Sequence, residues 1–319
     1  MSPAIKLEDV SFSYQADSLA LSNVGFSFNK GILGLIGPNG AGKTTLIKLL
    51  ATLLRPQQGE IFLNEISITE RTNIRKIIGY LPEHFMLYPT LTPRQIVRLL
   101  TQLYGLPLEE SKKLAVEALR RLNADQYLDK PIGKLSRGQQ QRVGLAQAIA
   151  QDPLILLLDE PLSGLDPFGR AEIKQLLQEF VTDGKSVLLS SHILMDLDEV
   201  CDQFAFLYKG KLHEYGDSSE LVRTYGEKMC RVKLQTVSTE ALEQIRIQAW
   251  VKSVESRGNI YHIHLTDLET AKKELPRLLI ETGCVILEYA IADIDLDYLF
   301  RKAFESNLEV RSAKDTPNL

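Results

Sequence analysis

Short apolar runs alternate with helically spaced apolar residues through the first two thirds of the chain. The runs predict β-strands at VSFSY (10–14), ILGLIG (32–37), LILLLD (154–159) and SVLLSS (186–191). LILLLD is almost continuously apolar, which is typical of a parallel strand that is covered on both faces. The alternation of strands and helices predicts an α/β fold for residues 1–219.

A helical pattern interrupts this alternation at about residues 84–150. Thr92 followed by Pro93 is typical of a helix N-cap with proline at the first helical position. Apolar residues then recur at helical spacing in two groups, namely Ile96, Leu99, Leu100 and Leu103, and, after Pro107, Leu114, Ala118, Leu119 and Leu122. We therefore expect a helical subdomain inserted into an α/β core.

The pattern changes again after Gly216. Strands are expected at residues 231–236, 251–256, 260–265 and 284–290, and helices near residues 239–249, 268–282 and 295–305. The order βαββαβ followed by a helix predicts a small ferredoxin-like α+β domain at residues 220–308. Pro276 is expected to interrupt its second helix. The polar segment 309–319 is expected to be a frayed tail.

The composition is that of an ordinary globular protein. The 319 residues are 44% hydrophobic and carry a formal net charge of −4, which fits about two domains and does not indicate nucleic-acid or lipid binding. No apolar run approaches the ~20 residues that cross a bilayer. The first residues lack the pattern of a secretion signal. We expect a cytosolic protein that acts at a membrane, if at all, from one side.

The spacing of cysteine and histidine does not predict a metal site. Cys201, Cys230 and Cys284 are far apart and form no CxxC motif, so we expect reduced, buried thiols. His262 and His264 would share one face of a strand, but further ligands are not indicated. We expect both histidines to face solvent.

The segment IGPNGAGKTT (36–45) places three glycines and a lysine between a strand and an expected helix at Leu46–Leu50. It matches G-x-x-x-x-G-K-[ST], a loop whose amides bind polyphosphate together with the free amides of the helix. The alternative is a glycine-rich turn with an unrelated lysine. In the binding interpretation, Lys43 contacts the β- and γ-phosphates of ATP or GTP and Thr44 ligates Mg²⁺. The expected nucleotide contacts are Gly37, Pro38, Asn39, Gly40, Ala41, Gly42, Lys43, Thr44 and Thr45.

Two carboxylates follow the apolar strand of LILLLDEP (154–161). Ligands in open α/β sheets bind outside the carboxyl ends of parallel strands, so Asp159 is placed to hold Mg²⁺ through water. Glu160 could polarise the attacking water as a general base. The alternative for Glu160 is a helix-start carboxylate that only complements the helix dipole.

The segment LSRGQQQRV (135–143) contains a capping box, Ser136 with Gln139, that opens a helix to about Ala150. Between the glycine-rich loop and LILLLDEP, this segment resembles the LSGGQ signature of the ATP-binding cassette (ABC) family, and the resemblance spans about residues 4–219. It implies that Ser136, Gly138 and Gln139 contact the γ-phosphate. Arg137 replaces a glycine of the signature. Its charge could pair with phosphate or with a neighbouring carboxylate, and both alternatives remain open.

Four more positions resemble functional residues of the family. Tyr14 in SFSYQ corresponds to the aromatic residue that stacks on adenine, although an ordinary strand tyrosine is the alternative. Glu83 in GYLPEHF replaces the glutamine of the Q-loop and is expected to reach Mg²⁺ or the attacking water. Asp166 in SGLD corresponds to the aspartate that touches the opposing subunit. His192 corresponds to the histidine that contacts the γ-phosphate.

The resemblance implies a P-loop ATPase that hydrolyses ATP, with Mg²⁺, at two sites shared by a dimer. The signature of one subunit covers the nucleotide on the other, so the partner is a second copy or a homologous ATPase. A separate integral-membrane permease is expected to dock near residues 83–105, at the cytoplasmic face of the membrane. The segments YLPE and ADIDLDYLF most resemble ATPase subunits of ABC-2 type exporters.

Two alternatives fit the sequence less well. A soluble ABC ATPase could act on nucleic acid, on ribosomes or on an assembly complex, but the interval from Lys43 to Ser136 is too short for a long coiled coil and basic arms are absent. We therefore expect no nucleic-acid partner. A monomeric P-loop kinase or GTPase would leave LSRGQ and His192 without a role.

Overall fold

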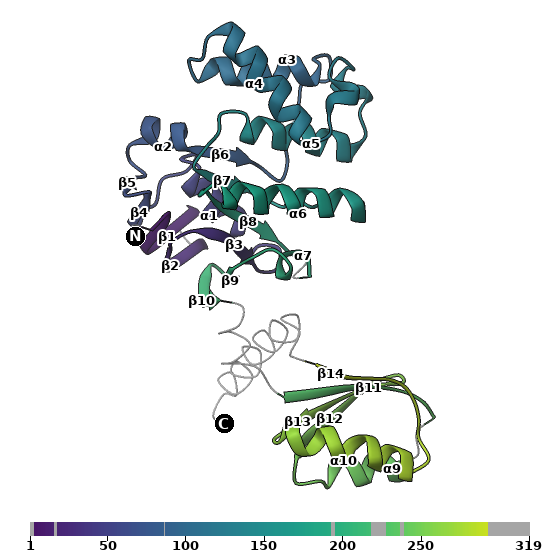
Figure 1. The fold of residues 1–319 in the computed structure, drawn as a ribbon. Coiled ribbons are helices and arrows are strands. Elements are labelled where there is room, and N and C mark those ends of the chain that lie inside the picture. The colour runs from purple at the N-terminus through teal and green to yellow at the C-terminus, as the bar shows by residue number, and fades with distance from the viewer. Residues whose placement is uncertain are drawn as a thin grey trace. The chain divides into compact units, whose positions relative to one another are not determined.

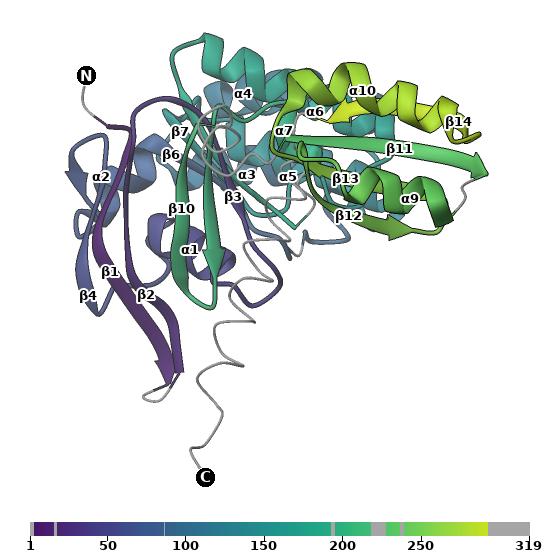
Figure 2. The ribbon, with the colours of Figure 1, turned by 90° about the horizontal axis from the view of Figure 1, so that it is seen from below.

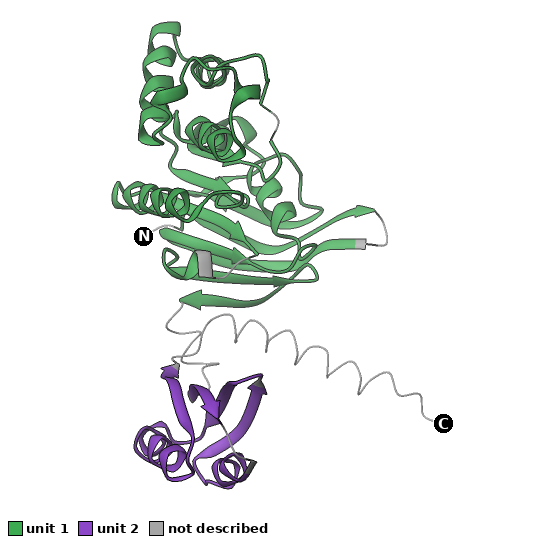
Figure 3. Cartoon of the chain, turned by 90° about the vertical axis from the view of Figure 1, so that its right-hand side faces the viewer, with its two compact units in different colours: residues 1–218 green, residues 219–319 purple. Residues whose placement is uncertain are grey.

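The structure is a computed structural model that describes residues 3–15, 18–85, 87–192, 195–217, 228–236 and 239–292. The chain divides into two units, residues 1–218 and 219–319, coloured green and purple in Figure 3. Each unit has a hydrophobic cluster of its own, so each builds a separate core.

A six-stranded sheet in the order β10-β9-β3-β8-β7-β6 forms the centre of the first unit (Figure 1). Its strands are β3 (Gly31–Ile36), β6 (Ile78–Leu81), β7 (Ile155–Leu158), β8 (Ser186–Ser191), β9 (Gln203–Tyr208) and β10 (Lys211–Asp217). Neighbouring strands are parallel, except that β10 runs antiparallel to β9. β3, β7 and β8 are buried at every position, which explains their continuous apolar runs and confirms these predicted strands.

A second, antiparallel sheet lies on the other side of the first helix. Its strands, in the order β2-β1-β4-β5, are β1 (Ile5–Gln15), β2 (Ser18–Phe28), β4 (Gln58–Leu63) and β5 (Ile66–Ser67). Figure 2 shows β1 and β2 side by side as a long hairpin. One hydrophobic cluster joins Val10 of this sheet, Leu46 and Leu50 of α1 (Lys43–Leu50), and Leu157 of the central sheet. α1 is therefore packed between the two sheets.

The predicted helical subdomain is present between β6 and β7. It contains α3 (Pro93–Leu103), α4 (Leu108–Arg121) and α5 (Arg137–Ile149), which lie together at one end of the unit in Figure 1. Thr92 forms the capping box of α3 with Gln95, as its pairing with proline predicts. Because β6 and β7 are neighbours in the sheet, the insert leaves and re-enters the core at one edge.

Three further α-helices are described in this unit. They are α2 (Arg71–Ile77), α6 (Pro167–Thr182) and α7 (Met195–Asp198). The first helix, α1, begins at Lys43 and not at Leu46 as the apolar pattern predicts. Gly42 is its N-cap in the left-handed conformation, with φ 107°, and turns the chain directly into the helix. Among the described residues, no helix is both long and apolar enough to cross a membrane.

The second unit has the predicted element order βαββαβ. Its elements are β11 (Lys228–Thr236), α9 (Thr239–Arg246), β12 (Val251–Arg257), β13 (Ile260–Leu265), α10 (Leu268–Glu281) and β14 (Val285–Ala292). The antiparallel sheet has the order β12-β13-β11-β14, and its core includes Val232, Trp250 and Leu275. The expected helix at 295–305 and the tail at 309–319 lie outside the described residues.

Two expectations for this unit are wrong. α10 continues through Pro276, because Leu275 and Leu279 are buried in the core and this packing outweighs the loss of one backbone hydrogen bond. His264 does not face solvent but is 1% exposed, and it lies in the inner strand β13 between Met229 of β11 and Ser253 of β12. His262 is half-buried.

The three cysteines are buried and free, as predicted.

We predict that Pro276→Ala stabilises the second unit by about 2 kcal/mol. The change restores a helical N–H group and removes the ring clash, which together cost roughly 3 kcal/mol, while a more flexible unfolded chain offsets up to about 1 kcal/mol. Trp250, the single tryptophan, is buried in this core, so its fluorescence during urea unfolding reports this unit. Lys273→Ala, an exposed change on the same helix, is the control. A lower midpoint for Pro276→Ala would contradict the argument.

Candidate functional site

The loop between β3 and α1 is shaped by its glycines. A β-carbon on Gly37 would lie 2.3 Å from the carbonyl oxygen of Leu207, so a side chain cannot fit at this position. Gly40 and Gly42 have φ values of +80° and +107°, which favour glycine. Asn39 and Gly40 are exposed. The loop therefore approaches β9 closely at its start and opens toward solvent in its middle.

Lys43 lies at the start of α1, with its side chain folded back on this loop. Its Nζ donates hydrogen bonds to the carbonyl oxygens of Gly37 at 2.6 Å and of Pro38 at 3.3 Å. Burial lowers the pKa of Lys43, whereas the nearby carboxylates of Glu160, Asp159 and Glu83 oppose that shift. Lys43 thus contributes a positive charge close to the three predicted carboxylates.

Asp159 follows β7 and is 1% exposed. Its Oδ1 accepts a hydrogen bond from the hydroxyl of Ser190 at 2.6 Å. Its Oδ2 is also buried but has no hydrogen-bond partner among the described residues. A buried carboxylate oxygen without a partner costs about 1–3 kcal/mol or more, so the site favours a donor or a cation at this oxygen.

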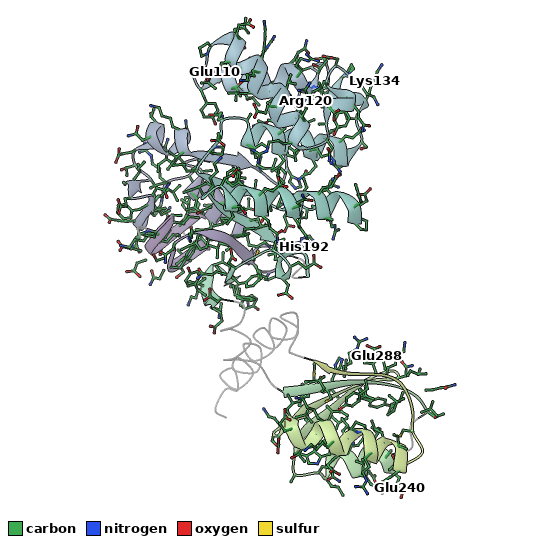
Figure 4. The ribbon with its side chains drawn as sticks, viewed as in Figure 1. Glu110, Arg120, Lys134, His192, Glu240 and Glu288 are labelled. Atoms are coloured by element: carbon green, nitrogen blue, oxygen red, sulfur yellow. The ribbon has the colours of Figure 1, made fainter. Side chains whose placement is uncertain are left out.

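Glu160 is buried and lies between Ser190 and His192. Its backbone N–H donates to the hydroxyl of Ser190 at 2.9 Å, and its Oε2 lies 2.9 Å from Nδ1 of His192 (His192 is labelled in Figure 4). The residue has φ 52°, an uncommon conformation for a side chain other than glycine that is found at functional sites. Burial raises the pKa of Glu160, and the hydrogen bond and charge of His192 oppose this. Ser190 and His192 therefore hold Glu160 in one orientation.

Sequence reasoning missed Ser190 and Tyr80. Ser190 binds both carboxylate residues, and its only sequence signal is the polar end of an otherwise apolar strand, SVLLSS. The hydroxyl of Tyr80 is buried without a hydrogen-bond partner among the described residues. Burial and the nearby Asp159 raise its pKa to about 12. Tyr80 pairs with Leu157, which lies two residues before Asp159. The side chains of Tyr80 and Asp159 therefore lie on the same face of the sheet.

The signature segment forms the predicted cap of α5. The Ser136 hydroxyl accepts from the backbone N–H of Gln139 at 3.3 Å, and the Gln139 side chain accepts from the N–H of Ser136 at 3.0 Å. Ser136 is exposed, whereas Gly138 and Gln139 are half-buried. Asp166 caps α6 in a similar way, since its Oδ1 accepts from the N–H of Gly169 at 2.7 Å. Both residues thus have a structural role in the chain itself.

Tyr14 and Glu83 lie at the edge of this arrangement. Tyr14 is 58% exposed, and its hydroxyl lies 3.4 Å from the hydroxyl of Thr45 in α1. Glu83 is partly exposed and lies 3.7 Å from Nε2 of His84. The structure therefore brings together Lys43, Asp159, Glu160 and His192, with Tyr14 and Glu83 beside them. Ser136 and Asp166 belong to a second group at the starts of α5 and α6.

Comparison with known proteins decides the family. The family model described as "ABC transporter" matches residues 21–163. The uncharacterized ABC transporter ATP-binding protein YxlF of Bacillus subtilis is 37% identical over 218 residues, which cover 68% of this chain and 72% of YxlF. The chain belongs to the ABC transporter family. The lantibiotic transport ATP-binding protein SrtF of Streptococcus pyogenes is 31% identical, over 70% of this chain and 97% of SrtF.

The solved structures agree with this assignment. The dimeric structure of the bacterial ABC transporter cassette MJ0796 is 30% identical, with a TM-score of 0.62, over 67% of this chain and 98% of that chain. The same cassette is known as a dimer in a post-hydrolysis state bound to ADP and phosphate. The chain is therefore an ATPase of the ABC family with a P-loop cassette fold, and its nucleotides are ATP and ADP.

We predict that Lys43→Ala lowers ATP affinity about 10- to 100-fold. The ammonium would make charge-assisted hydrogen bonds to phosphate, each of which contributes about 1.5–3 kcal/mol. Isothermal titration calorimetry with ATP measures the change. Lys48→Ala, five residues later on α1, is the control and should bind like the wild type. If Lys43→Ala bound ATP as tightly as the wild type, Lys43 would not contact the nucleotide.

We predict that Ser190→Ala lowers the turnover number about tenfold and changes ATP affinity less. The hydroxyl orients Asp159 and Glu160 at once, and its loss removes one hydrogen bond from each. Steady-state ATPase assays beside calorimetry separate the two effects. Ser186→Ala, a buried serine at the other end of β8, is the matched control. Equal turnover of the two variants would show that Ser190 has no part in catalysis.

Proposed function

We propose that this chain is the ATP-hydrolysing subunit of an ABC exporter, which dimerises around two ATP and drives a separate membrane permease. The observation that carries the proposal is the pairing of Glu160 with His192 at 2.9 Å beside Lys43 and Asp159. This arrangement supplies a cation for phosphate and an oriented base for water. The signature serine, Ser136, is exposed on the same chain, at the start of another helix.

The loop of residues 37–45 holds the phosphates of ATP in this proposal. Lys43, which now donates to loop carbonyls, would turn to the β- and γ-phosphates, whose negative charge makes them stronger acceptors. Thr44, Asp159 and Glu83 would hold Mg²⁺, and the buried, unpartnered Oδ2 of Asp159 fits a cation or its bound water. Bound Mg²⁺ would neutralise charge on the phosphates. Tyr14, exposed beside α1, would stack on adenine.

Glu160 acts as the general base for the attacking water. Burial raises its pKa above that of an ordinary glutamate, which makes the carboxylate a stronger proton acceptor. Ser190 fixes its backbone and His192 its carboxylate, so the base is already oriented before water arrives. His192 is 48% exposed and could also reach the γ-phosphate.

The second subunit completes each site. The free amides at the start of α5 carry partial positive charge, and the exposed Ser136 adds a hydroxyl, so this helix end suits the γ-phosphate of ATP bound to a partner. Asp166 would contact the partner beside it. The dimeric structures of MJ0796 support this arrangement. ATP would then be part of the dimer interface, and its hydrolysis would allow the two subunits to separate.

The helical subdomain presents an apolar surface for the permease. Exposed large side chains recur along residues 88–108, namely Tyr88, Leu99, Leu103, Tyr104 and Leu108, with exposed fractions from 41% to 75%. An exposed apolar surface on α3 and its flanks suits a helix of a membrane subunit. In this proposal, the chain therefore acts at the cytoplasmic face of a membrane. The segment YLPE and the second unit support the exporter class, and the permease would determine the cargo.

We predict that Glu160→Gln keeps ATP binding, lowers turnover at least about 100-fold, and forms a dimer with ATP. Glutamine retains the shape of the side chain but cannot accept the proton. Size-exclusion chromatography with light scattering, with and without ATP, measures the dimer. The control is Glu160→Gln combined with Lys43→Ala, which should stay monomeric at the ATP concentration that just saturates Glu160→Gln, because it binds ATP about 10- to 100-fold more weakly. If Glu160→Gln alone remained monomeric at saturating ATP, two copies of this chain would not share the nucleotide.

A further inference from the structure

Arg137, the residue that departs from the LSGGQ signature, packs on the loop that follows Glu160. A β-carbon on Gly164 would lie 2.9 Å from Nε, 3.1 Å from Cδ and 3.5 Å from Cγ of Arg137. The arginine side chain therefore fills the space beside the α-carbon of Gly164. Gly164 has φ +75°, so a glycine is favoured here both by its backbone and by this contact.

The contact adds a third interpretation, packing within the chain, to the two alternatives that the sequence leaves open. Among the residues that the structure describes, we find no ion pair between Arg137 and a carboxylate. The Cγ, Cδ and Nε atoms of the side chain lie beside Gly164 in the loop of residues 161–166. A long charged side chain often covers a surface through its methylene groups in this way. The structure thus favours a packing role for Arg137 within its own chain.

α5 holds this loop at more than one point. The side-chain amide of Gln141 donates to the carbonyl oxygen of Pro161 at 3.0 Å in a buried contact. At the helix start, a β-carbon on Gly138 would lie 3.4 Å from Leu165, so the helix and the loop are already in close approach. Arg137 covers the loop between these points. Its removal would loosen the outer part of the loop and leave the buried attachment at Pro161.

Contacts of this loop lie between two residues of the proposed mechanism, Ser136 and Glu160. Glu160 begins the loop, and its carbonyl oxygen accepts from the N–H of Ser163 at 3.2 Å, one residue before Gly164. Arg137 directly follows Ser136, the N-cap of α5. A short, contiguous path therefore runs from Ser136 through Arg137 and Gly164 to Glu160, and packed paths of this kind can carry energetic coupling.

We propose that Arg137 is a positioning residue that couples Ser136 to Glu160 and thereby links the two ATP sites of the dimer. The inference rests on the proposed function, in which Ser136 contacts the ATP of the partner while Glu160 serves the ATP of its own chain. Phosphate bound at Ser136 fixes the position of the start of α5. Through its contact with Gly164, Arg137 passes this restraint to the loop that follows Glu160. ATP at one site then favours hydrolysis at the other.

The test compares Arg137→Ala, Arg137→Lys and Lys134→Ala in the full chain. Lys134, labelled in Figure 4, is exposed three residues earlier and serves as the matched control. For Arg137→Ala we expect turnover to fall about 3- to 10-fold. We also expect its Hill coefficient for ATP to fall toward one from a wild-type value that cannot exceed two, the number of sites. Arg137→Lys should stay within about twofold of the wild type, because its methylenes still cover Gly164.

Two further measurements separate coupling from binding and folding. For Arg137→Ala, calorimetry on the monomer should give an unchanged ATP affinity and the midpoint of thermal unfolding should stay the same, because Arg137 is exposed and its described contact is with Gly164, outside the glycine-rich loop. Unchanged turnover and Hill coefficient, or the same losses in Lys134→Ala, would overturn the inference. A loss of turnover with an unchanged Hill coefficient would also overturn it, because coupling would then be absent.

The dimer assay distinguishes failure of this inference from failure of the proposed function. Glu160→Gln should dimerise with ATP whether or not Arg137→Ala is added, with a higher ATP requirement in the double variant. If Glu160→Gln dimerises and the double variant needs the same ATP concentration, the coupling is wrong and the proposed function stands. If Glu160→Gln does not dimerise, both are wrong for this chain.

Discussion

The site depends on the burial of two consecutive carboxylates, Asp159 and Glu160, at the end of one parallel strand. Neighbouring negative charges are costly where water is excluded, so donors and cations must surround them. Ser190 binds to both residues, His192 holds the second carboxylate, and Lys43 contributes positive charge. Burial still raises the pKa of Glu160, and one oxygen of Asp159 has no partner among the described residues. The folded chain is therefore electrostatically suited to a metal-bound nucleotide.

The central sheet explains why these groups meet although they are far apart in sequence. β8 lies between β3 and β7, so the glycine-rich loop, the carboxylates and His192 all leave the same edge of the sheet. Parallel strands make this inevitable, because all their carboxyl ends point one way. The burial of α1 between two sheets then fixes Lys43 over that edge. A rigid core thus places functional residues that are carried on loops.

The sequence predicted the groups whose chemistry is local, and missed those that depend on packing. The glycine-rich loop and the capping box of Ser136 are encoded within ten residues, so both could be recognised directly. Ser190 could not, because its partners lie about thirty residues earlier and only strand pairing joins them. The burial of His264 likewise depends on flanking strands, and local helix rules do not include the core contacts that carry α10 through Pro276.

Arg137 shows why a departure from a motif has to be understood in the folded chain. A glycine at that position would give the backbone more freedom, but it could not cover Gly164. The arginine restricts the helix start and fills the space beside Gly164, so it adds a contact to those that Gln141 and Gly138 already make with the loop. Better packing between Ser136 and the loop after Glu160 means that movement of one is more easily passed to the other. In the proposed dimer, the arginine would therefore change how firmly the two parts of the site are joined, while the capping box of Ser136 and Gln139 stays intact.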